Sequence, residues 1–185
     1  MALTESNMLQ LGTKAPDFNL PDTLDDEQKS YKDIRGKQAT VVMFICNHCP
    51  YVIHVKRQIV DLANDYLPKG VGFAAISSND VENYPQDAPE IMTVVGKALK
   101  YPFPYLYDGT QETAKAYDAA CTPDFYLFDG EDKLVYRGRL DENKPSSGRE
   151  PDGKELRAAI EAVLDGKGVS TQQYPSAGCN IKWKK

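Results

Sequence analysis

The stretch that decides the fold is ATVVMFICNHCPYVIHVKRQIVDLANDYLPKGVGFAAIS, residues 39–77. It begins and ends with runs rich in β-branched and aromatic residues, 39–46 and 71–77, which are typical of buried strands. Between them the apolar residues of 51–67 recur at helical spacing, and Pro50 stands where a first helical turn tolerates proline. A strand, a helix and a strand in this order predict two parallel strands joined by a right-handed crossover.

Further elements follow along the chain. The pattern predicts a helix over about 87–100 that Asp87 caps, a strand hairpin formed by 124–128 and 133–137, and an amphipathic helix over 153–165. A short helix is expected near 112–117, and a loop or short hairpin precedes the first long strand. These elements predict an α/β fold with a central mixed sheet flanked by helices on both faces.

The length of the chain predicts one domain. We expect a single domain over residues 1–185, with a core at about 12–165 and an extended C-terminal tail at about 166–185. The lysines near the end of that tail are expected to be solvated; they are Lys182, Lys184 and Lys185.

Composition excludes several classes of function. The chain is 41% hydrophobic and 26% charged with a net charge of -5, which is typical of soluble globular proteins and disfavours nucleic acid as a partner. No apolar run approaches the length that crosses a bilayer, and the first residues lack the pattern of a secretory signal. We therefore expect a cytoplasmic location and no membrane partner. Structural disulfides are rare in that compartment, so the four cysteines need another explanation.

Two of these cysteines, Cys46 and Cys49, frame His48 directly after the first strand. A thiol at the start of a helix is stabilised as a thiolate by unpaired N–H groups and by the helix dipole. The spacing therefore predicts a redox dithiol in which Cys46 attacks a disulfide and Cys49, one turn further on, resolves the mixed disulfide. A protonated His48 would lower the thiol pKa further.

Zinc binding is the competing interpretation of the motif. Structural zinc sites need four ligands, usually from a second chelating pair. The remaining candidates, His54, Cys121 and Cys179, form no such pair, and inert core cysteines are the third interpretation. A CxxC motif beside a strand–helix–strand pattern favours redox chemistry, so we expect no metal and no cofactor.

Three stretches carry a family resemblance: GTKAPDFNL at 12–20, GKQATVVMFICNHCP at 36–50 and CTPDFYLFDGEDKLVYRG at 121–138. Together they resemble the thioredoxin-like superfamily, in particular its alkyl hydroperoxide reductase/thiol-specific antioxidant branch. CNHCP and the tail motif GCNIKW at 178–183 resemble one group within that branch. The resemblance implies a thioredoxin-like fold with the N-terminal extension of peroxiredoxin-like proteins.

The resemblance also implies a role for Thr122 and Pro123. Their peptide bond is expected to be cis and to pack against the CxxC motif, while the Thr122 backbone pairs with an extended substrate segment. The implied partners are a disulfide-containing protein or small molecule and a thiol that donates electrons. A homodimer is the further partner that peroxiredoxin relatives suggest.

Peroxide reduction is the alternative activity. Cys49-Pro50 matches the peroxidatic cysteine of peroxiredoxins, and Cys46 or Cys121 would then resolve its oxidised form. Cys46 replaces the threonine of the peroxidase pattern, and the peroxidase arginine falls near Pro123, where no basic residue stands. Both departures favour thiol–disulfide exchange.

The other two cysteines have open roles. Cys121 is interpreted as a buried apolar residue or as an additional redox cysteine close to the dithiol. Cys179 lies in the expected tail, and a tail thiol that folds back onto the domain is the less favoured alternative. A non-catalytic metal-binding or interaction module is the third class of function that the motif allows.

Overall fold

The computed structural model describes residues 3–185, so residues 1 and 2 of the expected domain lie outside the described residues. The helices are α1 (Tyr31–Ile34), α2 (Pro50–Tyr66), α3 (Pro89–Leu99), α4 (Glu112–Ala116) and α5 (Lys154–Leu164). The strands are β1 (Leu3–Glu5), β2 (Asn19–Pro21), β3 (Gln28–Ser30), β4 (Ala39–Phe44), β5 (Val71–Ser77), β6 (Tyr105–Tyr107), β7 (Cys121–Thr122), β8 (Asp124–Asp129), β9 (Leu134–Gly138) and β10 (Ala177–Asn180). Within these residues no helix is long and apolar enough to cross a membrane.

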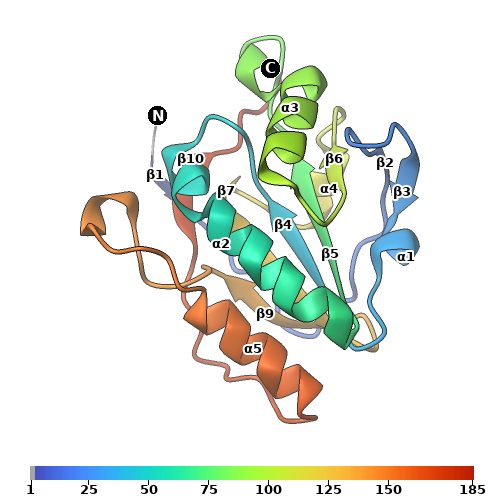
Figure 1. Cartoon of the computed structure of the whole chain (residues 1–185), viewed down its shortest axis with the longest axis vertical. Coiled ribbons are helices and arrows are strands. Elements are labelled where there is room, and N and C mark those ends of the chain that lie inside the picture. The colour runs from blue at the N-terminus through green and yellow to red at the C-terminus, as the bar shows by residue number, and fades with distance from the viewer. Residues whose placement is uncertain (1–2) are drawn as a thin grey trace.

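The central sheet has five strands in the order β6-β5-β4-β8-β9 (Figure 1). β4 and β5 pair in parallel, from Ala39 opposite Val71 to Phe44 opposite Ile76, and α2 connects them. β8 and β9 continue the sheet as an antiparallel hairpin. The predicted parallel pair and hairpin, and with them the mixed α/β sheet, are therefore confirmed.

Helices cover both faces of this sheet. Val41 and Met43 of β4 belong to the core cluster that includes buried residues of α2, α3 and α5. The alternate residues Val42 and Phe44 belong to a second cluster, which includes residues of α1 and α4. Successive side chains of a strand point to opposite faces of the sheet. Since helices cover both faces, the side chains on both faces of β4 are apolar.

Two details of the sheet differ from the prediction. β4 ends at Phe44, so Cys46 lies in the loop that leads into α2. The strand stops there because its partner β8 begins at Asp124, which pairs with Phe44. β6 was not predicted, since Pro102 and Pro104 precede it, and it is a short edge strand beside β5.

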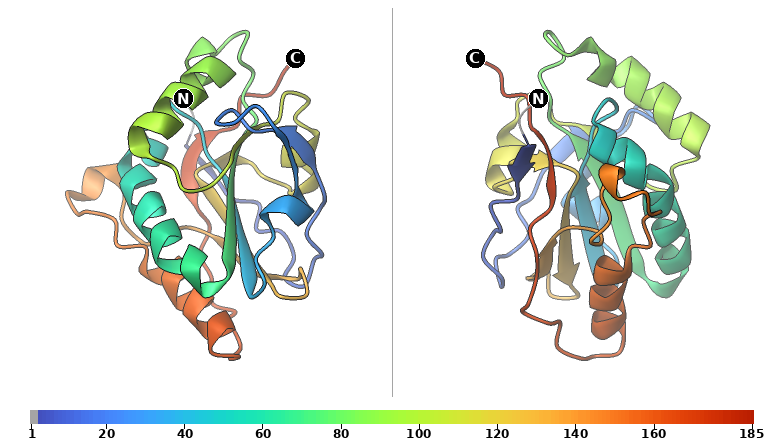
Figure 2. Two further views of the ribbon diagram at one scale, coloured as in Figure 1. Left: turned by 45° about the vertical axis from the view of Figure 1, so that its right-hand side comes forward. Right: turned by 90° about the vertical axis from the view of Figure 1, so that its left-hand side faces the viewer.

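The C-terminal tail packs onto the domain instead of extending into solvent. β10 lies between β1 and β7 in a separate three-stranded antiparallel sheet, which joins both ends of the chain (Figure 2). Lys182 is buried, contrary to expectation, because its N–H donates to Asn79 Oδ1 at 2.8 Å and its Nζ donates to the Asn180 carbonyl oxygen.

Gly178→Ala tests the docking of β10. A Cβ at this position would lie 2.0 Å from the Thr122 carbonyl oxygen, which is a backbone atom that cannot rotate away. We expect the free energy of unfolding to fall by about 1–3 kcal/mol, measured by urea denaturation, and Cys179 to become easier to alkylate. Gly168→Ala is the matched control, because nothing lies within 4 Å of its Cβ position. Equal stability of the two variants would contradict the docking.

Candidate active site

The sequence-predicted site residues come together at the carboxyl end of β4. Cys46, His48 and Cys49 lie between β4 and α2, and the Thr122–Pro123 peptide bond opposite them is cis. Cys46 Sγ lies 3.4 Å from Thr122 Oγ1, and Cys49 Sγ lies 3.3 Å from the Thr122 carbonyl oxygen. Thr122 therefore contacts both thiols of the motif.

Cys49 carries the more acidic thiol. It is the N-cap residue of α2 and is fully buried. Its pKa is lowered to about 5, chiefly because the Cys46 thiol donates a hydrogen bond to it, and burial opposes this effect only in part. The Cys179 thiol and the N–H groups of Val52 and Cys179 stabilise the thiolate further. Cys49 is therefore the sulfur that ionises first.

Cys46 has the opposite character. Its pKa is raised, first because it donates to Cys49, then because it is buried, and also because the Asp87 carboxylate lies nearby. This direction is the reverse of the one expected for an attacking Cys46.

Asp87 is a site residue that sequence reasoning missed. The N-cap of α3 is Ala88, so the predicted capping role of Asp87 is wrong. Its fully buried carboxylate instead accepts from the Asn47 N–H and the Asn79 side chain, both at 2.7 Å, and lies 2.6 Å from His48 Nδ1. His48 therefore pairs with Asp87 and not with Cys49.

One group within residues 3–185 has the composition of a metal site. The ligand atoms of Cys46, His48 and Asp87 lie within 4.8 Å of one another, and His48 Nε2 is buried without a hydrogen-bond partner. Three ligands are one fewer than a structural zinc site uses. His54, Cys121 and Cys179 are not members of the group.

Cys179 lies in a different place from the extended tail that the sequence predicts. Strand β10 brings its sulfur to 2.7 Å from Cys49 Sγ, so the less favoured alternative, a tail thiol folded back onto the domain, is what the structure has. Burial raises the pKa of Cys179 to about 12, and donation to Cys49 adds to this shift. The GCNIKW motif was the only sequence feature that marked Cys179, and it does not indicate which residue Cys179 contacts.

Cys121 faces away from this group. It pairs with Asn180 in the strand ladder, whereas Thr122 pairs with Cys179, and successive residues of a strand point to opposite faces. Its Sγ lies 3.9 Å from the carbonyl oxygens of Pro123 and Ser176. Burial raises the pKa of Cys121, which makes it a poor nucleophile.

The arginines nearest in sequence to Pro123 have other partners. Arg137 donates to the Leu9 carbonyl oxygen and to the Gln173 side chain, and Arg139 pairs with Glu155. Among the hydrogen bonds and ion pairs of residues 3–185, neither arginine contacts Cys49.

A second buried acid follows the cis bond. Asp124 is fully buried, and burial raises its pKa to about 7 although Ser6 Oγ and the Tyr126 hydroxyl donate to it. The sequence shows that Asp124 follows Pro123 directly, but the neighbouring residues do not indicate that its carboxyl is buried.

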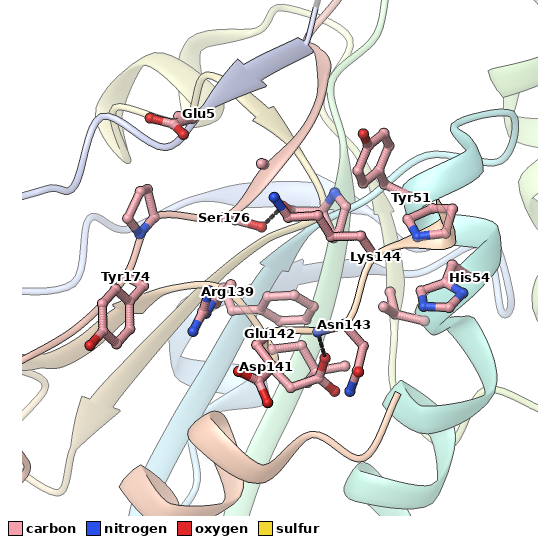
Figure 3. Close-up of a pocket in the computed structure, with 17 residues that line it drawn as sticks. Glu5, Tyr51, His54, Arg139, Asp141, Glu142, Asn143, Lys144, Tyr174 and Ser176 are labelled. Atoms are coloured by element: carbon pink, nitrogen blue, oxygen red, sulfur yellow. Dashed lines mark hydrogen bonds between the residues drawn. The ribbon is translucent and has the colours of Figure 1, made fainter. Parts of the chain in front are cut away.

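A pocket of about 230 Å³ lies beside Pro123 (Figure 3). Tyr51 and His54 of α2 line one side of it, and Glu5 and Tyr174 lie across from them. None of the four cysteines lines this pocket. The pocket therefore flanks the thiols without opening onto them.

Comparisons with known proteins identify the family and the fold. The family model described as Redoxin matches residues 10–160. The chain is similar to a solved structure of an uncharacterized conserved protein from Geobacillus kaustophilus, with 56% identity, a TM-score of 0.98, and 100% and 97% of the two chains covered. A hypothetical protein from Sinorhizobium meliloti 1021 is 45% identical, with a TM-score of 0.95 and 98% of each chain covered.

A proposed thioredoxin from Neisseria meningitidis is 25% identical, with a TM-score of 0.64 and 83% and 91% of the two chains covered. The comparison with curated proteins returned no match. The fold and the paired thiols opposite a cis-proline define a thioredoxin-like protein. The match to the Redoxin model supports its place in the alkyl hydroperoxide reductase/thiol-specific antioxidant branch. The chain belongs to the Redoxin family, and its class of activity is that of an oxidoreductase.

The lowered pKa of Cys49 predicts a pH-dependent contribution to stability. Between about pH 5 and the pKa of an ordinary thiol, about 8.5, the folded protein holds a thiolate while the unfolded chain holds a thiol. Unfolding then takes up a proton, so the free energy of unfolding rises with pH across this window, and the gain is lost as pH falls through about 5.

The measurement is the difference in free energy of unfolding between wild type and Cys49→Ser, from urea denaturation at several pH values. The comparison with Cys49→Ser is needed because Asp124 has the opposite effect. Its raised pKa makes the free energy of unfolding fall as pH rises from about 4 to 7. Cys121→Ser is the control, and its profile should parallel that of wild type. A wild-type minus Cys49→Ser difference that does not change from pH 5 to pH 8 would contradict a Cys49 thiolate.

Proposed function

We propose that the protein is a thiol–disulfide oxidoreductase whose CxxC dithiol reduces or exchanges disulfides in proteins or small molecules. The observation that carries this proposal is the pairing of one acidic and one non-acidic thiol against Thr122. A dithiol reductant needs a thiolate that attacks and a second thiol that keeps its proton until the mixed disulfide has formed.

The order of the two thiols in this proposal is the reverse of the order predicted from the motif. The motif favours Cys46 as nucleophile and Cys49 as resolving residue, but the pKa directions support attack by Cys49. Its thiolate attacks one substrate sulfur and releases the other as a thiolate, which leaves a mixed disulfide on Cys49. A second thiol of the centre then attacks Cys49, forms a protein disulfide and releases the remaining substrate thiol. Cys46 is the second thiol that the motif supplies, and His48 tunes it through Asp87.

Peroxide reduction by Cys49 is the second candidate, and the low pKa of Cys49 is the observation that favours it. A peroxidatic thiolate would take one peroxide oxygen as sulfenic acid, and a neighbouring thiol would condense with it and release water. The partners of Arg137 and Arg139 count against this candidate, because both guanidinium groups are engaged away from Cys49.

The proposed partners include a thiol that donates electrons. A thiol donor would reduce the protein disulfide again, and no cofactor is required because both electrons come from cysteines. A cytoplasmic location is part of the proposal, and so is a homodimer, which the family resemblance implies.

Side-by-side assays of disulfide and peroxide reduction test this function. Reduced wild type should reduce glutathione disulfide, and Cys49→Ser should lose at least about 100-fold of that rate because the attacking thiolate is gone. Cys46→Ser should keep the first step, seen as the release of glutathione when Cys49 attacks. Cys121→Ser serves as the control and should match wild type. Peroxide consumption without disulfide reduction would replace the proposed activity by the peroxidase. Full disulfide reduction by Cys49→Ser would exclude attack by Cys49.

A further inference from the structure

The pairing of β10 with β7 places Cys179 against Cys49. β10 is antiparallel to β7, with Cys179 directly opposite Thr122. Residues opposite one another in an antiparallel pair project to the same face, so Cys179 shares the face on which Thr122 meets the CxxC thiols. The two sulfurs lie 2.7 Å apart, and a disulfide requires about 2.05 Å. A small movement therefore suffices to join them.

The segment that carries Cys179 is anchored on both flanks. On one side, Ser176 Oγ donates to the Pro123 carbonyl oxygen. On the other side, the Ile181 N–H donates to the Ala120 carbonyl oxygen at 3.0 Å, and the Lys182 N–H donates to Asn79 Oδ1. These contacts hold the Cys179 thiol against Cys49, and only 5% of the surface of Cys179 is exposed.

We propose that Cys179 is the resolving thiol of the active site, so that the oxidised protein carries a disulfide between Cys49 and Cys179. This inference rests on the proposed thiol–disulfide exchange. The Cys49 thiolate attacks a substrate disulfide RSSR, forms the Cys49–SR bond and releases RS⁻. Cys179 loses its proton and attacks the Cys49 sulfur, which breaks the bond to SR and forms the Cys49–Cys179 bond. The released RS⁻ takes that proton, so two protein thiols have reduced one substrate disulfide.

The charges around the two candidate thiols favour Cys179 over Cys46 for this step. Once Cys49 is bound to SR it is no longer a thiolate, so its effect on both neighbours disappears. Cys46 remains buried beside the Asp87 carboxylate, which opposes its ionisation more than the Thr122 hydroxyl favours it. Cys179 remains buried, but the positive charge of Lys182 assists its ionisation. The electrostatics therefore agree with the geometry.

Disulfide mapping of the full-length wild type is the direct test. The reduced protein is mixed with glutathione disulfide, remaining thiols are alkylated in acid, and the protein is digested with trypsin. Cleavage after lysine places Cys46 and Cys49 in peptide 38–56 and Cys179 in peptide 168–182. We expect the two peptides to be linked through Cys49 and Cys179, with Cys46 alkylated. An internal Cys46–Cys49 bond with Cys179 alkylated would overturn the inference.

Variants test the rate of the resolving step. In Cys179→Ser and Cys179→Ala the glutathione adduct on Cys49 should persist, with its loss slowed at least about tenfold, because the thiol held next to it is gone. Cys121→Ser, which removes a buried thiol of the same sheet that faces away from Cys49, should resolve like wild type. Circular dichroism checks that each variant is folded. Resolution at the wild-type rate in both Cys179 variants would overturn the inference.

These results separate the inference from the proposed function. A wild type that does not reduce glutathione disulfide, yet forms the Cys49–Cys179 bond when diamide oxidises its thiols, would refute the function and support the pairing. A wild type that reduces glutathione disulfide through a Cys46–Cys49 bond would support the function and refute the pairing.

Discussion

The negative charge on the buried Cys49 sulfur is the interaction on which the rest of the site depends. A charge without water is costly unless hydrogen-bond donors replace the solvent. Here the donors come from three parts of the chain: the loop after β4 supplies the Cys46 thiol, α2 supplies the Val52 N–H, and β10 supplies the thiol and N–H of Cys179. The start of α2 adds the positive end of the helix dipole. These elements therefore meet around one sulfur, whose negative charge they stabilise together.

The second sheet is what brings β10 into that arrangement. β1 and β7 would each present an unpaired edge without it, and β10 fills the space between them. Gly178 permits the approach, because no side chain fits between its backbone and the Thr122 carbonyl oxygen. The sheet therefore joins the two ends of the chain to the strand that precedes the cis-proline, and the site is complete only when all three segments are in place.

The sequence predicts those parts of the structure whose causes are local. Alternating and helical patterns are enough for β4, α2 and β5, and the resemblance in CTPDF is enough for Thr122 and Pro123. Cys179 and Asp87 could not be found this way, because their roles come from contacts 130 and 39 residues away in the chain. The segment 177–180 is a strand only because two edges accept it, and its own residues, AGCN, have little strand propensity. The roles of Cys46 and Cys49 were assigned from spacing, which does not reveal that Asp87 lies beside one sulfur and Cys179 beside the other.

The position of β10 also bears on the kind of disulfide that the site can take. The family resemblance implies that an extended substrate pairs with Thr122, the residue before the cis-proline, and here β10 occupies that edge of Thr122. An extended polypeptide and β10 cannot pair with the same edge at the same time. A polypeptide that displaces β10 removes Cys179 from Cys49 and takes away one of the thiolate's donors. A small disulfide needs no strand edge and can react at Cys49 after only a local opening of the structure. If Cys179 resolves Cys49, the strand that competes with extended polypeptides for the Thr122 edge is also the strand that completes the reaction, and we therefore propose small disulfides as the preferred substrates.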